Sequence, residues 1–220
     1  MNVNPAAKRI LCFGDSNTWG YIPGTDHQRY PSDIRWPGMM QSLLGNGYEI
    51  IEEGLNSRGI ENGDDRPEKG GRSAVEYIVP CLDSHDPLDC IIVFLGSNEL
   101  KSRLNLLPRE VGESLRRLLL LIASRSSQGG RSKPHIVVVV PPVIDEETEY
   151  CRMLDKYMGA HDKSLALKTI FKSIAEEVGV GVIDMQDELK TGDDGVHLLP
   201  ESHRCLAERL ANELKETLKT

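Results

Sequence analysis

The chain has 220 residues, 39% hydrophobic and 27% charged, and its 26 basic and 34 acidic side chains give a net charge of −8. This length and composition suit a chain that buries its own core. The acidic excess disfavours electrostatic binding of nucleic acids or anionic membranes, so we expect neither as a partner. The segment MNVNPAAKRI lacks the apolar core of a signal peptide, and no apolar run approaches membrane-spanning length.

The cysteines indicate a reducing environment. They form no CxxC pair, and an odd number cannot all be bridged; they are Cys12, Cys81, Cys90, Cys151 and Cys205. Cys12 and Cys90 lie within apolar runs, where a thiol is usually a small buried hydrophobe. We therefore expect a cytoplasmic location.

Short apolar segments and helical periodicities alternate along the chain. The predicted strands are 8–13, 48–53, 89–95, 135–140 and 179–184. Apolar residues recur at steps of three and four over 111–122, 167–178 and 206–214, as in amphipathic helices. This alternation predicts an α/β fold, a flavodoxin-like three-layer α/β/α sandwich. Its five-stranded parallel sheet should have the order 2-1-3-4-5.

No linker or repeat divides the chain, so we expect residues 1–220 to form a single domain. The polar stretch 124–133 is a predicted helix-to-strand loop. Three longer irregular stretches remain, at 20–35, 56–73 and 142–160. Loops of that length usually serve function or are mobile, and those at 20–35 and 142–160 could close over a site.

Small and polar residues follow four of the predicted strands. They are the segments GDS (14–16), GLNSRG (54–59), GSNE (96–99) and DDGVH (193–197). In a parallel sheet, ligands bind beyond the carboxyl ends of the strands, so we expect these four loops to lie together.

The loops supply the groups that acyl transfer requires. The Ser16 hydroxyl needs a base to become a nucleophile, which His197 can supply, and Asp194 can fix the tautomer of that imidazole. Alone, Ser16 could cap a helix and Asn98 could form a turn. Among six histidines, however, only His197 has an aspartate three positions before it. The combination favours a catalytic triad.

Four blocks of the chain resemble the GDSL/SGNH hydrolases, a family named for its Ser, Gly, Asn and His. The blocks are FGDSNTWG (13–20), EEGLNSRG (52–59), LGSNEL (95–100) and DGVH (194–197). The likeness covers nearly the whole chain and is closest to the bacterial arylesterase/acyltransferase branch, in which RWPG (35–38) also recurs.

The resemblance implies the SGNH hydrolase fold and a role for each matching residue. Ser16 would be the nucleophile, His197 the base and Asp194 the orienting carboxylate. The oxyanion hole would consist of the Ser16 N–H, the Ser57 N–H and the Asn98 side chain.

Two residues depart from the family pattern. Ser57 stands where the family usually has glycine, which leaves Gly54 and Gly59 as alternative donors to the oxyanion. Glu99 stands where an aspartate usually follows the asparagine, and its extra methylene could shift Asn98. These departures affect rate and substrate rather than the type of chemistry.

Some other residues near the blocks have both a functional and a structural interpretation, and for others we expect a structural role alone. The aromatic residues of the first long loop could line a pocket or anchor the loop; they are Trp19, Tyr21, Tyr30 and Trp36. The charged run 63–72 is most simply a solvated loop, with a lid as the alternative. We expect Asp15 to bond its own turn and Asp193 to be solvated.

The sequence thus predicts a serine esterase that hydrolyses short-chain aryl, alkyl or acetyl esters through an acyl-enzyme on Ser16. A small-molecule ester is the expected partner, with no cofactor or metal, and a homo-oligomer is expected only because related enzymes assemble. No GxSxG, GxGxxG, P-loop or HExxH motif favours another enzyme class. The alternatives are an acyltransferase that uses an alcohol acceptor and a non-catalytic module that binds a glycan or small ester.

Overall fold

The computed structural model describes residues 2–64, 66–124, 133–153 and 156–218. Its centre is a parallel sheet with the strand order β2-β1-β3-β4-β5. The strands are β1 (Lys8–Gly14), β2 (Tyr48–Gly54), β3 (Cys90–Phe94), β4 (His135–Val139) and β5 (Gly181–Ile183). All five predicted strands and their predicted order are confirmed.

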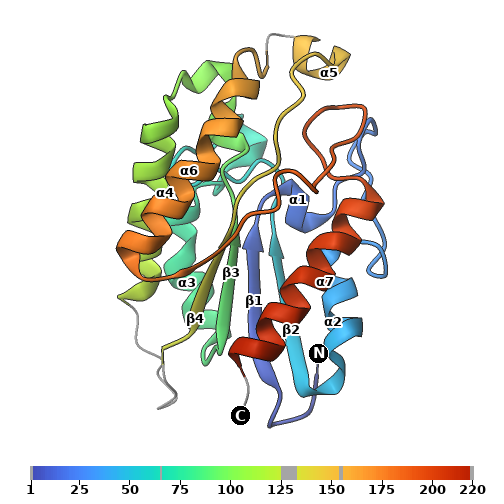
Figure 1. Cartoon of the computed structure of the whole chain (residues 1–220), viewed down its shortest axis with the longest axis vertical. Helices are drawn as coiled ribbons and strands as arrows, with labels where there is room; N and C mark the ends of the chain where they lie inside the picture. The colour runs from blue at the N-terminus through green and yellow to red at the C-terminus, as the bar shows by residue number, and fades with distance from the viewer. Residues whose placement is uncertain (1, 65, 125–132, 154–155, 219–220) are drawn as a thin grey trace.

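Helices cover both faces of the sheet (Figure 1). One face carries α3 (Ala74–His85), α4 (Pro108–Ala123) and α6 (Ala160–Val178), and the other carries α2 (Trp36–Leu44) and α7 (Pro200–Thr217). Because side chains alternate along a strand, Leu11 and Phe13 pack into the first core and Ile10 and Cys12 into the second. The predicted three-layer sandwich is confirmed.

Three of these helices, α4, α6 and α7, contain the predicted periodicities. The sequence did not single out α3, which contains Pro80, or α2, which has a proline in its first turn. Two shorter helices are α1 (Ser16–Trp19) and α5 (Glu149–Arg152). Four 3-10 turns complete the described elements: Gly45–Gly47, Pro67–Lys69, Asn98–Leu100 and Ser102–Leu104.

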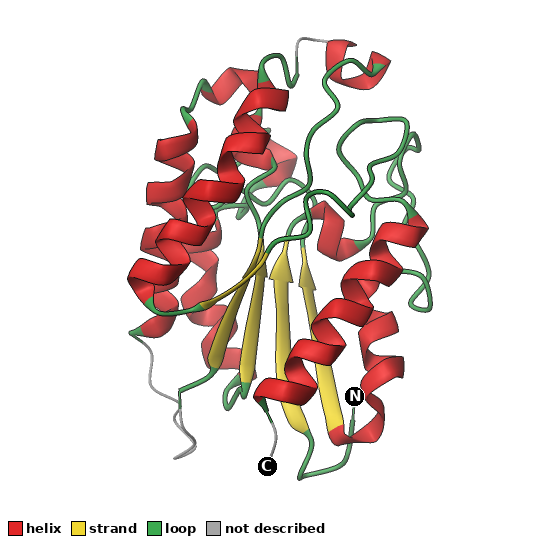
Figure 2. Cartoon of the chain, in the orientation of Figure 1, coloured by secondary structure: helices red, strands yellow, loops and turns green. Residues whose placement is uncertain are grey.

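The long irregular stretches gather beyond the carboxyl ends of the strands, where the loops rise above the sheet in Figure 2. The stretch 20–35 contains no helix or regular strand, and α5 lies within 142–160. Most of the polar stretch 124–133 lies outside the described residues.

All five cysteines are free, and Cys205 alone is not fully buried. Across the described ranges, no helix combines the length and apolar character needed to cross a bilayer.

Candidate active site

Ser16 is the first residue of α1 and follows the tight turn at the end of β1. Gly14 is required there, because a Cβ would lie 2.1 Å from the Thr18 hydroxyl and 2.7 Å from the Phe94 carbonyl oxygen. Asp15 caps α1, since its carboxylate accepts from the Asn17 N–H at 2.9 Å. The structural role predicted for Asp15 is confirmed, and the Ser16 hydroxyl is not used as the cap.

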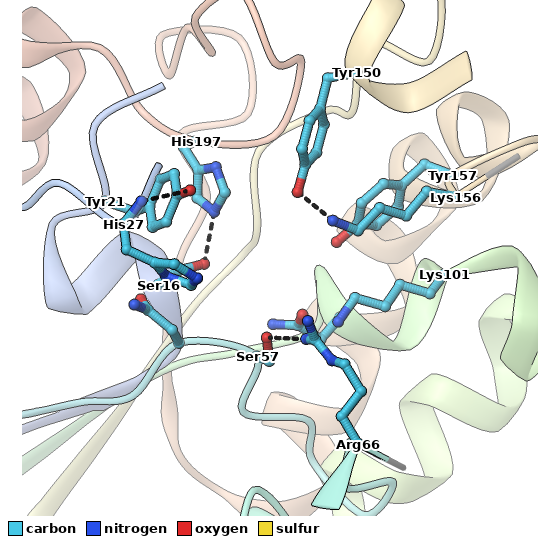
Figure 3. A pocket seen from close by; sticks show the side chains of 12 residues that line it. Ser16, Tyr21, His27, Ser57, Arg66, Lys101, Tyr150, Lys156, Tyr157 and His197 are labelled. Atoms are coloured by element: carbon cyan, nitrogen blue, oxygen red, sulfur yellow. Dashed lines mark hydrogen bonds between the residues drawn. The ribbon is translucent and has the colours of Figure 1, made fainter. Parts of the chain in front are cut away.

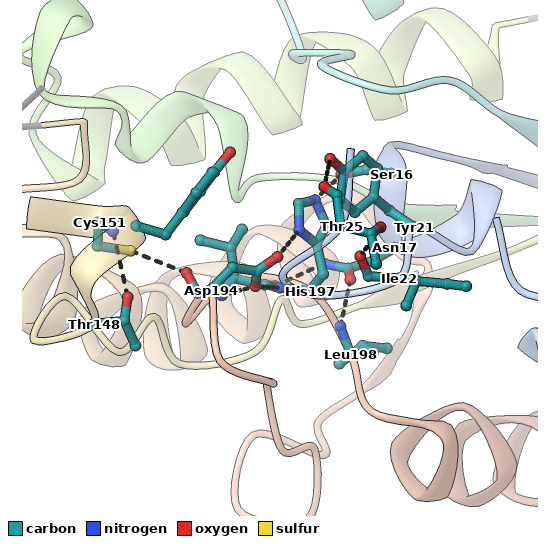
Figure 4. Close-up of polar contacts among 12 residues, drawn as sticks. Ser16, Asn17, Tyr21, Ile22, Thr25, Thr148, Cys151, Asp194, His197 and Leu198 are labelled. Carbon is teal, nitrogen blue, oxygen red and sulfur yellow. Dashed lines mark hydrogen bonds and ion pairs between the residues drawn. The ribbon is translucent and has the colours of Figure 1, made fainter. Parts of the chain in front are cut away.

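Ser16, His197 and Asp194 form a continuous chain of hydrogen bonds (Figure 4). His197 Nε2 lies 2.9 Å from Ser16 Oγ, and His197 Nδ1 lies 2.6 Å from Asp194 Oδ2. The exposed fractions of Ser16 and His197 are both 7%, and that of Asp194 is 2%. The structure therefore brings together the three predicted triad residues, although 181 positions separate the serine from the histidine.

The second carboxylate oxygen of Asp194 holds its own turn. Asp194 Oδ1 accepts from the Val196 N–H at 3.0 Å and the His197 N–H at 2.9 Å. Burial by itself would raise the pKa of Asp194, but the hydrogen bonds and charge of His197 outweigh it and lower the pKa. Asp194 is thus held ionised beside the imidazole, whereas its neighbour Asp193 is exposed, as predicted.

Asn17 ties the serine turn to the histidine loop, a contact that the sequence did not suggest. Its Nδ2 donates to the Val196 carbonyl at 3.2 Å, and its Oδ1 accepts from the Leu198 N–H at 3.0 Å. Gly195 completes the loop with a φ of +71°, and a Cβ there would lie 2.1 Å from the Asp145 carbonyl oxygen. These contacts fix the position of His197 against Ser16.

The aromatic residues of the first loop divide between the two interpretations. Tyr21 stacks on the His197 ring with centroids 4.3 Å apart and lines the pocket. Trp36 is fully buried in the core, and Tyr30 packs edge-on against His203 at 5.4 Å. Trp19 lies under the Arg29 guanidinium at 5.1 Å. Only Tyr21 is placed to touch a ligand.

Two of the oxyanion-hole candidates line the same pocket as Ser16, namely Ser57 and Asn98. Ser57 has a φ of +66°, which explains why a glycine is usual at this position. Gly59 already donates its N–H to the Arg72 carbonyl at 3.0 Å. Neither Gly54 nor Gly59 lines the pocket, so the geometry favours Ser57 as the donor from this loop.

The Asn98 side chain is held by the two neighbouring loops. Its Nδ2 lies 3.1 Å from the Arg58 carbonyl oxygen and 3.3 Å from Asp15 Oδ2. The buried Arg58 guanidinium donates to the Gly14 carbonyl at 3.0 Å and lies 4.2 Å over the Phe13 ring. Arg58 therefore joins the carboxyl ends of β1 and β2 beneath Asn98.

Glu99 does not displace Asn98 from the pocket. Its side chain turns away into the interior, is fully buried, and accepts from the Ile60 N–H. Burial raises the pKa of Glu99 to about 7, so this carboxyl is largely protonated below that pH. The extra methylene is accommodated in the interior rather than at the site.

All three long stretches contribute to a pocket of about 180 Å³ at Ser16 (Figure 3). Tyr21 and His27 come from the first stretch and Arg66 from the second. The third contributes Tyr150, Lys156 and Tyr157. Lys101 reaches the pocket from the turn after Asn98–Leu100. Apart from Tyr21, these residues were not predicted, because the pattern of a single chain does not show which loop residues converge.

One group of side chains in the described residues has the proximity of metal ligands. The ligand atoms of Glu53, Cys81 and His85 lie within 4.8 Å of one another. However, His85 is already bonded to Glu53 at 3.0 Å, and the Arg58 guanidinium lies 3.8 Å from the same carboxylate. Burial also raises the pKa of Cys81 to about 12, which keeps the thiol protonated. The group is better suited to internal pairing than to a cation.

The fold and the linked serine, histidine and aspartate are typical of hydrolases that attack carbonyl carbon. Residues 12–205 match the model of the GDSL-like lipase/acylhydrolase family. The chain belongs to this family, and the predicted resemblance is confirmed. No curated protein matches the chain significantly.

Solved structures of esterases are similar over almost the whole chain. An aryl esterase from M. smegmatis is 30% identical with a TM-score of 0.89, covering 96% of this chain and 99% of that one. A carbohydrate acetylesterase from Sinorhizobium meliloti is 32% identical with a TM-score of 0.88, covering 95% and 99%. Family and neighbours together support ester hydrolysis as the general activity.

Proposed function

We propose that the protein is a serine esterase that hydrolyses short-chain carboxylic esters through an acyl-enzyme on Ser16. The observation that carries this proposal is the unbroken link from Ser16 Oγ through His197 to the buried Asp194 carboxylate, at 2.9 and 2.6 Å. A non-catalytic binding module would have no need for this alignment. The aryl and acetyl esters named for the two similar structures suggest the same classes of substrate here.

The proposed reaction begins when His197 Nε2 takes the Ser16 proton as Oγ attacks the ester carbonyl carbon. The negative oxygen of the tetrahedral intermediate accepts from the N–H groups of Ser16 and Ser57 and from the Asn98 amide. For this, Asn98 Nδ2 exchanges its longer bond to Asp15 Oδ2, at 3.3 Å, for the oxyanion and keeps its bond to the Arg58 carbonyl. His197 then gives its proton to the leaving alcohol, and the Ser16 acyl ester remains. Water, deprotonated by His197, attacks this ester and releases the acid and free Ser16.

We infer that water is the acyl acceptor. Tyrosine hydroxyls and the cationic groups of Arg66, Lys101 and Lys156 surround the pocket, and such polar groups favour hydration over exclusion of water. If an alcohol were the acceptor, adding a primary alcohol at fixed ester concentration would divert the acyl group into a new ester. Chromatography of the products distinguishes the two acceptors.

The test of the esterase proposal is release of p-nitrophenol from p-nitrophenyl acetate near neutral pH. Wild type and Ser32→Ala should turn over equally, because Ser32 is an exposed serine of the first loop. Ser16→Ala should lose turnover by roughly four orders of magnitude or more. Equal rates in Ser16→Ala and wild type would place the chemistry elsewhere and exclude the proposal.

Four further properties remain proposals. One continuous sheet with its helical layers supports a single domain over residues 1–220. The five free cysteines support a reducing, cytoplasmic location. A small-molecule ester remains the proposed partner and a homo-oligomer a prediction, which light scattering of the purified chain would test.

A further inference from the structure

We propose that the pocket beside Ser16 contains an anion subsite, formed chiefly by Lys101 and Lys156, which selects esters carrying a carboxylate or phosphate group. This inference rests on the proposed esterase function, because it assigns the substrate class of the same site. It follows from the charges that line the pocket, which are opposite in sign to the net charge of −8 on the whole chain.

Lys101 is the central group of this subsite. Its exposed fraction is only 7%, yet it lines the pocket, and its ammonium has no hydrogen bond or ion pair within the described residues. Burial and the neighbouring Lys156 lower the pKa of Lys101 to about 8, despite the attraction of Asp64. A cation that is this strongly desolvated, and that has no partner among the described residues, gains more from a bound anion than an exposed cation does.

Lys156 adds a second cation from a different loop. Its Nζ bonds to the Tyr150 hydroxyl and lies 4.2 Å from the centroid of the Tyr150 ring, contacts that do not neutralise its charge. In Figure 3, Lys156 and Lys101 point into the space beside Ser16. The hydroxyls of Tyr150 and Tyr157 face the same space and can donate to an anionic oxygen.

The charged side chains that the structure describes on the pocket wall are of one sign. None of the described residues that line the pocket is an aspartate or glutamate, whereas three are lysine or arginine. Arg66 is largely neutralised by Asp64, with two nitrogen–oxygen distances of 2.7 Å, so it adds less than the lysines. Among the described residues, the uncompensated positive charge therefore lies on Lys101 and Lys156, where an anionic part of the substrate would be held next to the nucleophile.

The experiment compares charged and neutral esters that are otherwise alike. On the alcohol side, 4-acetoxybenzoate is compared with its methyl ester. On the acyl side, mono-(4-nitrophenyl) succinate is compared with its methyl ester. A third probe, 4-acetoxyphenyl phosphate, distinguishes a phosphate from a carboxylate. The quantity measured is the ratio of kcat/KM for the charged ester to kcat/KM for the neutral one.

We expect wild type to prefer the charged ester in at least one pair. Lys101→Gln should lower that preference by roughly tenfold or more, as for loss of a charged hydrogen bond. Lys156→Gln should lower it too, and this variant leaves the turn that holds Asn98 unaltered. The matched control is Lys215→Gln, which makes the same change of charge. The Lys215 side chain is exposed, and the residue lies about 22 Å along α7 from the first residue of that helix. This control should keep the wild-type ratio.

Equal kcat/KM for charged and neutral esters in wild type, or a preference that both lysine variants retain, would overturn the anion subsite. If wild type hydrolyses no ester at all, the esterase proposal fails instead, and calorimetry of 4-acetoxybenzoate binding then tests the subsite directly. Binding that Lys101→Gln weakens and Lys215→Gln does not would support the subsite. Absence of binding to wild type would refute it.

Discussion

Replacing Asp194 by asparagine tests the alignment of the site while changing almost none of its volume. The carboxylate accepts three hydrogen bonds, with Oδ1 facing the N–H groups of Val196 and His197 and Oδ2 facing the imidazole at 2.6 Å. An asparagine has only one acceptor oxygen, so it must choose between the turn and the ring. When the oxygen faces the turn, two hydrogen bonds are kept rather than one. The additional hydrogen bond contributes a net free energy of about 1 kcal/mol, which favours that orientation by about fivefold.

In the favoured orientation the asparagine NH2 group points at His197 Nδ1. The imidazole then accepts at Nδ1 and carries its proton on Nε2, which faces Ser16 Oγ at 2.9 Å. A protonated Nε2 cannot take the serine proton, and the imidazolium also loses its carboxylate. We therefore expect kcat/KM for p-nitrophenyl acetate to fall by roughly 10⁴, with the free energy of unfolding lowered by only about 1 kcal/mol.

The matched control is Asp193→Asn, which makes the same chemical change on the exposed neighbouring residue. It should leave kcat/KM at the wild-type value. Circular dichroism melts of both variants show whether the fold is kept. A folded Asp194→Asn enzyme with activity within about tenfold of wild type would refute the assigned role of the carboxylate.

Other predictions concern the loops around the triad. Asn98→Ala should lower kcat for p-nitrophenyl acetate by roughly 10²–10³, and the control Asn212→Ala, on the exposed face of α7, should not; a loss below about tenfold would remove Asn98 from the oxyanion hole. Ser57→Gly should raise the free energy of unfolding by up to about 1 kcal/mol in urea melts, because it relieves a φ of +66°, while kcat is kept by the backbone N–H; a large loss of kcat would contradict this. The native Glu99 carboxyl keeps its proton to about pH 7 and the unfolded one only to about 4.5, so wild-type stability should fall as pH rises through this window. In urea melts, the free energy of unfolding should fall between pH 4 and pH 8.5 by about 3 kcal/mol less for Glu99→Gln than for wild type. An equal fall in both proteins would refute this prediction.

The sequence predicted most of the sheet because burial leaves a strong pattern. Strands covered on both faces read as apolar runs, and β3 and β4 are almost continuous in apolar residues. Helix α4 has a clear apolar stripe and was predicted. Helix α3 contains Pro80, and no helix was predicted over its residues. Helix α2 is only nine residues long, too short for a reliable periodicity.

The candidate site was partly predictable for a different reason. Ser16 and Asn98 follow β1 and β3 closely, and the Asp194–His197 pair lies in the loop after β5, so the topology of a parallel sheet brings them to one edge. Lys101 and the residues of the 142–160 stretch enter the pocket through loop conformation, which no periodicity encodes. The same applies to Asn17, whose contacts with the histidine loop span 179 and 181 positions.

The central claim is that Ser16 becomes covalently acylated during turnover, and intact-mass spectrometry of rapidly quenched enzyme tests it most directly. After mixing with p-nitrophenyl acetate and quenching in acid within milliseconds, wild type should carry one added acetyl group, and peptide mapping should place it on Ser16. Ser32→Ala should acquire the same adduct and Ser16→Ala none. An adduct located on another residue, or one that persists at wild-type levels in Ser16→Ala, would contradict the account.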